Sequence, residues 1–267
     1  MYILENKYYN EESVFKPDNL LREARRQKNK PDCKVPAICL LDPDGDLTDY
    51  LLKNVKAIKN NCWACYHSSL YNFHLTANEL GILPCVVGSS YAVLVAEQLF
   101  VSGCKLIISV TSAGVICDPG DVRRFVLIES SIRDEGTSYH YISPEKPARL
   151  DSHLLALLKM QENNLTNPYF IGKSWTTDAP FRETSSAIGE MKKNNISCVE
   201  MEAAALYALS EAKHYNILCF AHLTNSMAQQ QGDFEKGEEF GSIATLKLVS
   251  HVIQILQQKN ILQYSKC

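Results

Sequence analysis

The chain has 267 residues, of which 46% are hydrophobic and 21% charged, an ordinary composition for a globular protein with one large core. Its 27 basic and 30 acidic residues give a formal charge of -3, so no positive excess is present to hold nucleic acid. The first residues lack a signal-peptide pattern, and no apolar run reaches the roughly 18 residues of a membrane helix. We therefore expect a cytoplasmic protein that binds neither nucleic acid nor membranes.

Ten cysteines are present, and most lie inside apolar runs, as do Cys39, Cys85 and Cys219. A free thiol in such a run behaves as a small hydrophobic side chain. The pattern therefore predicts reduced cysteines in the core rather than disulfides.

Cys62 and Cys65 form a C-x-x-C motif. A redox pair would need a thioredoxin-like βαβ context, and zinc would need a second pair of ligands at suitable spacing, for which Cys33 and Cys39 are poorly placed. We expect neither a redox pair nor a metal site here.

Short apolar runs alternate along the chain with longer segments of helical periodicity, which predicts an α/β sheet covered by helices on both faces. The expected strands are Ala37–Leu41, Leu83–Val87, Lys105–Val110, Arg124–Ile128, Tyr169–Gly172, Ser197–Glu200 and Ile217–Leu223. The expected helices are Asn19–Gln27, Tyr91–Ser102, Ser152–Gln161, Phe181–Lys192, Ala203–His214 and Ser242–Gln258. Ser89 or Ser90 would cap the second of these helices, and Gly103 would end it.

The first thirty residues are more polar than the rest, and "LLREARRQKNK" has the pattern of an amphipathic helix outside the sheet. No linker or internal repeat follows. We therefore predict an N-terminal helical extension over residues 1–30 and one domain over residues 31–267.

The segment "CVEMEAAALYAL" carries two acids, Glu200 and Glu202, with apolar neighbours, where a strand runs into a helix. In an extended backbone both carboxylates would lie on one side. A carboxylate is an acceptor with two oxygens and is suited to a vicinal diol such as the 2′ and 3′ hydroxyls of ribose. Alternatively, Glu202 only occupies the first turn of a helix, where the helix dipole favours an acid.

Two further stretches combine groups typical of ligand sites. In "ISVTSAGVI" a strand is followed by Thr111, Ser112, Ala113 and Gly114, which would form a ligand loop at the carboxyl end of the sheet, or simply a turn. In "WTTDAPFRET" the candidates are Asp178, Phe181 and Arg182, which could face a heterocycle or belong to an ordinary loop. The stretch "IRDEGTSYHY" could similarly be functional or a solvated loop.

The blocks "LLDPDGD", "SVTSAGVICDPGDV", "IRDEGTSYHY" and "CVEMEAAALYAL", closed by "AHLTN", together resemble the nucleoside phosphorylase superfamily. The resemblance spans most of the chain from Pro36 onward, and "IRDEGTSYHY" is most similar to the uridine phosphorylase branch. It implies a single-domain three-layer α/β/α sandwich with a mixed central sheet. It also implies a homo-oligomer, a dimer or a hexamer, that needs no metal or organic cofactor and binds a small-molecule nucleoside.

The resemblance implies roles for individual residues. Met201 and Glu202 would hold the ribose, with Glu200 as a supporting partner. Asn225 stands where purine-specific members carry an aspartate, which favours a uracil-like or 6-oxopurine base. Phe181 would stack on that base and Arg182 would donate to its carbonyl oxygens. Asp178, close by in sequence, is a catalytic candidate with Glu202 and Asn225.

The phosphate site departs from the family pattern. Leu41 and Gly45 stand where a glycine and an arginine are expected, and Ser109 and Thr111 stand where an arginine and a glycine are expected. A serine hydroxyl is a poor substitute for the charged fork of a guanidinium in binding phosphate.

Three explanations for this departure remain open. In the first, arginines from elsewhere bind phosphate as co-substrate, and the candidates are Arg22, Arg25 and Arg26. In the second, water attacks the sugar and is oriented by an acid among Asp42, Asp44 and Asp46. In the third, the protein binds nucleosides without catalysis. We expect cleavage of the N-glycosidic bond of a ribonucleoside, by phosphorolysis first and by hydrolysis second.

Overall fold

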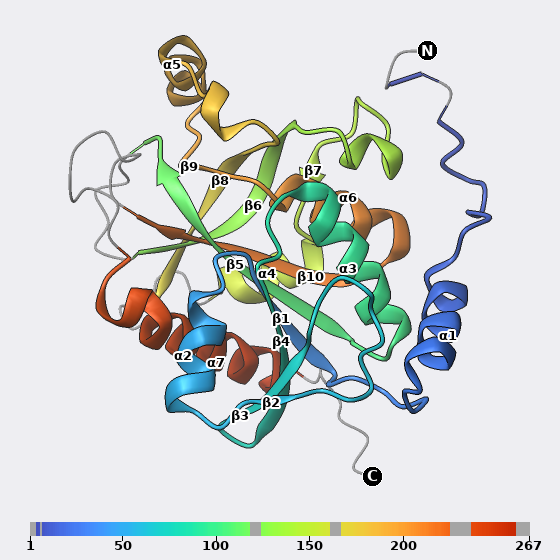
Figure 1. Cartoon of the computed structure of the whole chain (residues 1–267). Coiled ribbons are helices and arrows are strands. Elements are labelled where there is room, and N and C mark those ends of the chain that lie inside the picture. Colours follow the sequence, from blue (N-terminus) through green and yellow to red (C-terminus); the bar gives the residue numbers. More distant parts are fainter. Residues whose placement is uncertain (1–3, 6, 118–123, 161–166, 225–235, 260–267) are drawn as a thin grey trace.

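The computed structural model describes residues 4–5, 7–117, 124–160, 167–224 and 236–259 (Figure 1). Its helices are α1 (Pro17–Lys28), α2 (Asp46–Asn54), α3 (Ser89–Val101), α4 (Ser152–Lys159), α5 (Ser185–Lys193), α6 (Ala203–Lys213) and α7 (Ser242–Gln258). Its strands are β1 (Ile38–Asp42), β2 (Ile58–Lys59), β3 (Tyr71–Leu75), β4 (Asn78–Pro84), β5 (Leu106–Val115), β6 (Phe125–Asp134), β7 (Ala148–Arg149), β8 (Tyr169–Thr177), β9 (Cys198–Glu200) and β10 (Asn216–Leu223). None of the described helices is both long and apolar enough to cross a bilayer.

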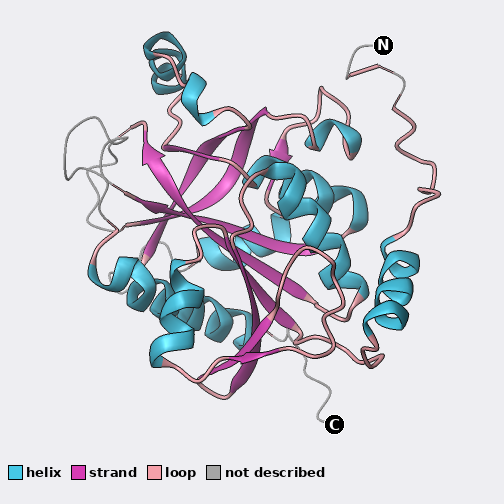
Figure 2. Ribbon diagram, viewed as in Figure 1, coloured by secondary structure: helices cyan, strands magenta, loops and turns pink. Residues whose placement is uncertain are grey.

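The predicted three-layer α/β/α sandwich with a mixed sheet is confirmed. Helices α3 and α6 pack together on one face of the sheet, with α1 outside α3, and α2, α4 and α7 cover the other face (Figure 2). All five residues of β1 are buried, as expected for a strand covered on both sides. Helix α6 is buried around its circumference from Ala203 to Ser210, which makes it the centre of its layer.

Part of the sheet closes on itself. Strand β5 runs parallel to β1 and β10 and antiparallel to β9. Strand β6 pairs with β10 and with β8, and β8 pairs with β9. The pairings therefore link β5, β10, β6, β8 and β9 into a ring, and β4, β3 and β2 continue the sheet from β1.

The small residues Thr111 to Gly114 do not form the predicted loop. Strand β5 continues through them to Val115, because they pair on one side with Ala221 to Leu223 of β10 and, at Gly114, with Val199 of β9. Short side chains here allow three strands to meet where the ring closes.

Several other boundaries differ from the prediction. Strand β4 ends at Pro84, before the predicted Val87, because Cys85 adopts a left-handed conformation with φ 57°. Helix α5 begins at Ser185 rather than Phe181, since the Thr184 side chain accepts a hydrogen bond from the Ala187 N–H. Helix α2 and strands β2, β3 and β7 were not predicted. Strands β2 and β7 have only two residues each, and β3 and α2 are short, with five and nine residues.

The predicted amphipathic helix is confirmed as α1, which buries Leu21 and Ala24 against Ala64. Lys28 donates to the Cys65 carbonyl at 2.6 Å, and Lys30 donates to the Asn61 carbonyl at 3.3 Å. These contacts attach the N-terminal helix to the loop between β2 and β3. The proposed division at residue 30 stays a prediction.

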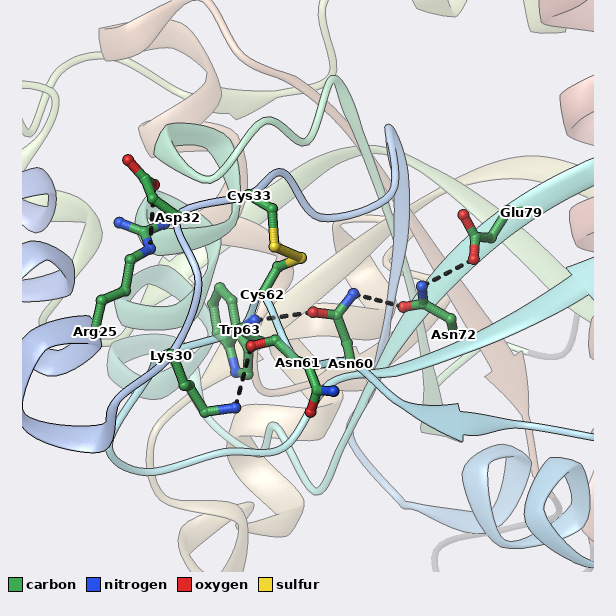
Figure 3. Close-up of a disulfide and its surroundings, with 10 residues drawn as sticks. All are labelled: Arg25, Lys30, Asp32, Cys33, Asn60, Asn61, Cys62, Trp63, Asn72 and Glu79. Carbon is green, nitrogen blue, oxygen red and sulfur yellow. Dashed lines mark hydrogen bonds and ion pairs between the residues drawn. A yellow bond between two sulfur atoms is a disulfide. The ribbon is translucent and has the colours of Figure 1, made fainter.

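The expectation that the cysteines are reduced is wrong for one pair. Cys33, after α1, and Cys62, before β3, form a disulfide that joins the same two segments (Figure 3). The partner of Cys62 is therefore Cys33, and Cys65 of the C-x-x-C motif is a buried free thiol. Cys39 and Cys219 are buried free thiols as predicted, whereas Cys85 is exposed because it follows the end of β4.

Candidate active site

Glu200, the last residue of β9, lies on a buried network of hydroxyl groups. Its Oε1 accepts hydrogen bonds from Ser174 at 2.9 Å and from Thr176, both on β8. Ser174 donates in turn to Ser131 of β6 at 2.8 Å, and Ser131 lies 2.7 Å from the Thr176 hydroxyl. Every hydroxyl in this group has a partner, so three strands hold the carboxylate in one orientation.

The second oxygen of Glu200 fixes the start of α6. Its Oε2 accepts from the backbone N–H groups of Glu202 and Ala203, each at 2.7 Å. An acid at this place satisfies two of the free N–H groups of a helix N-terminus. Glu200 thereby sets the position of Glu202.

Glu202 occupies the N-cap position of α6, and its side chain reaches toward the start of α3. Its Oε1 accepts from the Gly88 N–H at 2.8 Å, and Ser89 donates to the carbonyl of Met201 at 2.8 Å. Ser89 therefore does not cap its own helix as predicted. The other Glu202 oxygen, Oε2, is buried and has no hydrogen-bond partner among the described residues.

Both carboxylates are shielded from solvent, with 3% of Glu200 and 2% of Glu202 exposed. Burial raises the pKa of Glu200, against the effect of its hydrogen bonds. Burial, followed by the charge of Glu200, raises the pKa of Glu202 to about 8, while the Gly88 N–H and the Thr111 side chain act in the other direction. Glu202 is thus mostly protonated at neutral pH, and a ligand that donates hydrogen bonds favours its ionised form.

Asp44 contacts β5 beside this pair. Its Oδ2 accepts both the backbone N–H of Ser112 at 3.1 Å and the Ser112 hydroxyl at 2.6 Å. The turn between β1 and α2 that carries Asp44 has Gly45 at φ 83°, a conformation that glycine adopts readily. Ser112 is next to Thr111, which lies near Glu202, so the two acid sites adjoin.

The other two acids of the β1–α2 turn have different surroundings. Asp42 is 5% exposed, and its Oδ2 accepts from the backbone N–H and the hydroxyl of Thr48, both at 2.8 Å. Burial raises the pKa of Asp42 to about 6. Asp46 lies 2.5 Å from the Lys236 ammonium group, which is also 3.4 Å from Asp44.

A small pocket opens between this turn and the start of α7. Its lining includes Asp44, Asp46, Ser112, His222 and Lys236. The His222 ring stacks on Phe125 with centroids 4.5 Å apart. Burial lowers the pKa of His222 to about 4, so this side chain is neutral at pH 7.

The remaining predicted residues of β5 line the sheet end without a common partner. Ala113 is buried and its carbonyl accepts from Thr224, the residue after β10, at 3.2 Å, and Gly114 pairs with Val199. Ser109 lies deeper in the strand, 2% exposed, and its hydroxyl has no hydrogen-bond partner.

The structure does not bring Asp178, Phe181 and Arg182 into contact with the Glu202 site. All three are exposed, and Phe181 is 99% exposed in a 3₁₀ turn after β8. The Asp178 carboxylate accepts from the Gly136 N–H at 3.0 Å. Asn225 lies outside the described residues.

"IRDEGTSYHY" folds into the end of β6 and an internally bonded turn rather than a solvated loop. The Arg133 guanidinium donates to the Ser138 hydroxyl at 2.8 Å and to the Ser143 carbonyl at 2.6 Å. Glu135, 6% exposed, accepts from the backbone N–H groups of Thr137 and Ser138. The charged side chains Arg133 and Glu135 therefore form hydrogen bonds with groups of the same turn.

The α1 arginines considered for phosphate have partners close to their own helix. Arg22 and Arg26 contact Glu23, and Arg25 contacts Asp32 at 3.4 Å. Over the described ranges, no group of three or more His, Cys, Asp or Glu side chains is arranged to hold a metal ion.

Some site residues were missed in the sequence. Gly88, Ser174, Thr176 and Lys236 all contact the acids described above. Two of these residues could have been found from the sequence. Gly88 precedes two serines at a strand-to-helix junction, and Lys236 is the lone base of "GDFEKGEEFG". Ser174 and Thr176 carried none, since hydroxyl residues are common in strands.

The fold is that of an α/β protein, and its candidate site lies where the strands of a partly closed sheet meet two helix N-termini. Residues 37–257 match the model of the Phosphorylase superfamily, and the chain belongs to this family.

Three characterised relatives are similar over part of the chain. A guanosine phosphorylase of Halorubrum lacusprofundi is 25% identical over 144 residues, which cover 54% of this chain and 60% of the relative. A purine nucleoside phosphorylase of Plasmodium vivax is 28% identical, covering 46% of this chain and 51% of the relative. A uridine phosphorylase of Thermococcus kodakarensis is 27% identical, covering 46% and 50%. The matches thus span half to three fifths of these relatives.

Solved structures share the fold over a larger part of the chain. A uridine phosphorylase of Vibrio fischeri superposes with a TM-score of 0.65 at 19% identity, covering 84% of this chain and 90% of that one. A purine nucleoside phosphorylase of Toxoplasma gondii in complex with immucillin-H gives a TM-score of 0.68 at 14% identity, covering 87% and 94%.

Proposed function

We propose that the protein cleaves the N-glycosidic bond of a ribonucleoside at Glu202. The observation that carries this proposal is the buried Glu202 Oε2, next to Met201, for which the described part of the chain offers no hydrogen-bond partner. It is made in a family whose relatives are named for action on guanosine, purine nucleosides and uridine. A buried carboxyl oxygen without a partner is costly. A ribose hydroxyl would satisfy it.

Charge development during the reaction fits this placement. As the bond between C1′ and the base nitrogen breaks, the electron pair leaves with the base and the sugar becomes positively charged. Ribose hydroxyls and this positive charge both favour the ionised form of Glu202. The carboxylate then stabilises the transition state more than the substrate, which is the requirement for catalysis.

Phosphorolysis and hydrolysis, the two reactions that the sequence predicts, share this step and differ in the group that attacks C1′. For the leaving group we propose a uracil-like or 6-oxopurine base. Support for the base comes from the sequence, since the amide of Asn225 can bond to a base without protonating it. We also propose a homo-oligomer, by similarity to the family alone.

The test is incubation of the purified protein with a panel of ribonucleosides, with and without inorganic phosphate, followed by chromatography of the free base. We expect release of base from at least one nucleoside. Isothermal titration with the same nucleosides runs in parallel. Saturable binding without any base release would show a nucleoside-binding protein and would contradict the enzymatic proposal.

A further inference from the structure

Ser112 presents two hydrogen-bond donors toward one point. Its backbone N–H and its hydroxyl both reach Asp44 Oδ2, at 3.1 and 2.6 Å. Two donors that converge in this way suit an oxygen of an anion. In this chain the oxygen belongs to the protein itself.

The charges around this point are unfavourable to a second anion. The described lining of the pocket contains one cation, Lys236, and three carboxylates, Asp42, Asp44 and Asp46. The Lys236 ammonium is shared between Asp44 and Asp46. His222 adds no charge, because burial lowers its pKa to about 4. The net negative charge here would repel inorganic phosphate, and the described lining residues include no arginine to bind it.

The donor pair adjoins the proposed reaction site. Thr111, the neighbour of Ser112 on β5, has a side chain close enough to Glu202 to lower the pKa of that acid. The charge of Asp44 acts on Glu202 in the opposite direction. The Asp44 contact with Ser112 therefore lies one residue along β5 from Thr111, whose side chain acts on Glu202.

We infer that Asp44 determines which group attacks C1′. Its carboxylate occupies the two hydrogen-bond donors of Ser112, and it thereby excludes inorganic phosphate and selects water. This inference rests on the proposed cleavage at Glu202. It names hydrolysis as the reaction of that site, with Asp44 as its specificity-determining residue.

The hydrolytic step balances without a further reactant. The bond between C1′ and the base nitrogen breaks, and its electron pair goes to the base. The oxygen of water forms the new bond to C1′. One water proton stays on the new 1-hydroxyl group and the other is delivered to the base, so the products are free ribose and the neutral base.

The first test measures phosphate binding directly and needs no turnover. Isothermal titration with inorganic phosphate compares the wild type with Asp44→Ala, which frees both Ser112 donors and leaves Lys236 paired with Asp46. The matched control is Asp49→Ala, which removes an exposed acid of α2 in the same region. We expect about tenfold or tighter phosphate binding in Asp44→Ala and no gain in Asp49→Ala.

The second test follows nucleoside cleavage by the wild type in buffer freed of phosphate and after phosphate is added. We expect equal rates and free ribose as the sugar product. Rates that require phosphate and yield ribose 1-phosphate would overturn the inference and leave the proposed cleavage intact. So would wild-type phosphate binding as tight as that of Asp44→Ala. If nucleosides are not cleaved but Asp44→Ala gains phosphate binding, the proposed function fails and the exclusion of phosphate by Asp44 stands.

Discussion

Glu200 Oε2 accepts the backbone N–H of Glu202 at 2.7 Å, so that one buried acid sets the position of the other. The two carboxylates of one short segment therefore have different tasks. Glu200 is fully bonded to the strand network and to the helix, while Glu202 keeps one oxygen without a partner.

Exchanging each acid for its amide should separate these tasks. Glu202→Gln should lower kcat by about 100- to 1000-fold, typical of the loss of one preorganised electrostatic contact, without a loss of stability at neutral pH. Glu200→Gln should lower the free energy of unfolding by about 1–3 kcal/mol, since an amide cannot accept from all four donors. Glu211→Gln, an exposed exchange on α6, is the control. Steady-state kinetics and urea unfolding measure both effects, and a stable, active Glu202→Gln protein would refute the assignment.

The rate should depend on the ionisation of Glu202. Because burial raises the pKa of Glu202 to about 8, the ionised form accumulates only above that pH in the free protein. We expect kcat/KM to rise with pH up to about 8 and then level off, since kcat/KM reports the free enzyme. The rise should be absent in Glu202→Gln. A flat wild-type profile between pH 6 and 9 would mean that Glu202 does not act as a carboxylate.

The same pKa predicts how stability changes with pH. Glu202 binds its proton more tightly in the folded chain than in the unfolded chain, where the pKa is near 4.5, so its contribution is fully present below about pH 4.5. That contribution is lost as pH rises through about 8. The melting temperature of Glu202→Gln, relative to that of the wild type, should therefore rise between pH 5 and pH 9. A melting-temperature difference that is constant with pH would contradict this reading.

The disulfide should hold α1 in place. Cys33 and Cys62 are separated by 29 residues, and a cross-link over such a loop stabilises a protein by about 3–4 kcal/mol in the chain-entropy model. We expect Cys33→Ser to lower the melting temperature and to speed proteolysis between α1 and β1. Cys85→Ser, at an exposed free thiol, is the control. Denatured protein should also titrate two more thiols after reduction than before, and an equal count would show that the bond is absent.

Phe181 offers a test of base stacking. An aromatic side chain that is 99% exposed makes almost no contribution to the fold, so Phe181→Ala should leave the melting temperature unchanged. If Phe181 stacks on the base, the substitution should raise KM about tenfold, within the 1–3 kcal/mol typical of such stacking. Tyr8→Ala removes another exposed aromatic ring as a control. An unchanged KM would assign Phe181 to another surface.

The sequence predicts the sheet well where strands are buried on both sides. The apolar runs of β1 and β10 and the alanine-rich α6 leave few alternatives. The sequence also predicts that Glu200 and Glu202 lie where a strand runs into a helix, because acids among apolar residues need local hydrogen-bond partners.

The contact between Asp44 and Ser112 was beyond such reasoning. It joins residues 68 positions apart, and three aspartates in one turn were equally suitable candidates. The left-handed conformation of Gly45 and the hydrogen bond from Thr48 to Asp42 determine which of the three aspartates contacts Ser112. The disulfide was missed because ten cysteines offer many pairings, and the packing of α1 against α3 and the loop between β2 and β3 brings Cys33 to Cys62.

Gly241, the N-cap of α7, shows how a missing side chain can govern a charged site. A Cβ built there would lie 2.3 Å from His222 Cε1 and 2.9 Å from the Lys236 carbonyl oxygen, and the residue has φ 78°. The imidazole and the lysine backbone can approach each other only because nothing stands between them. Even a methyl group would force the His222 ring or the Lys236 backbone to move, so the hydrogen atom of one glycine lets the residue that binds Asp44 and Asp46 lie beside a buried imidazole.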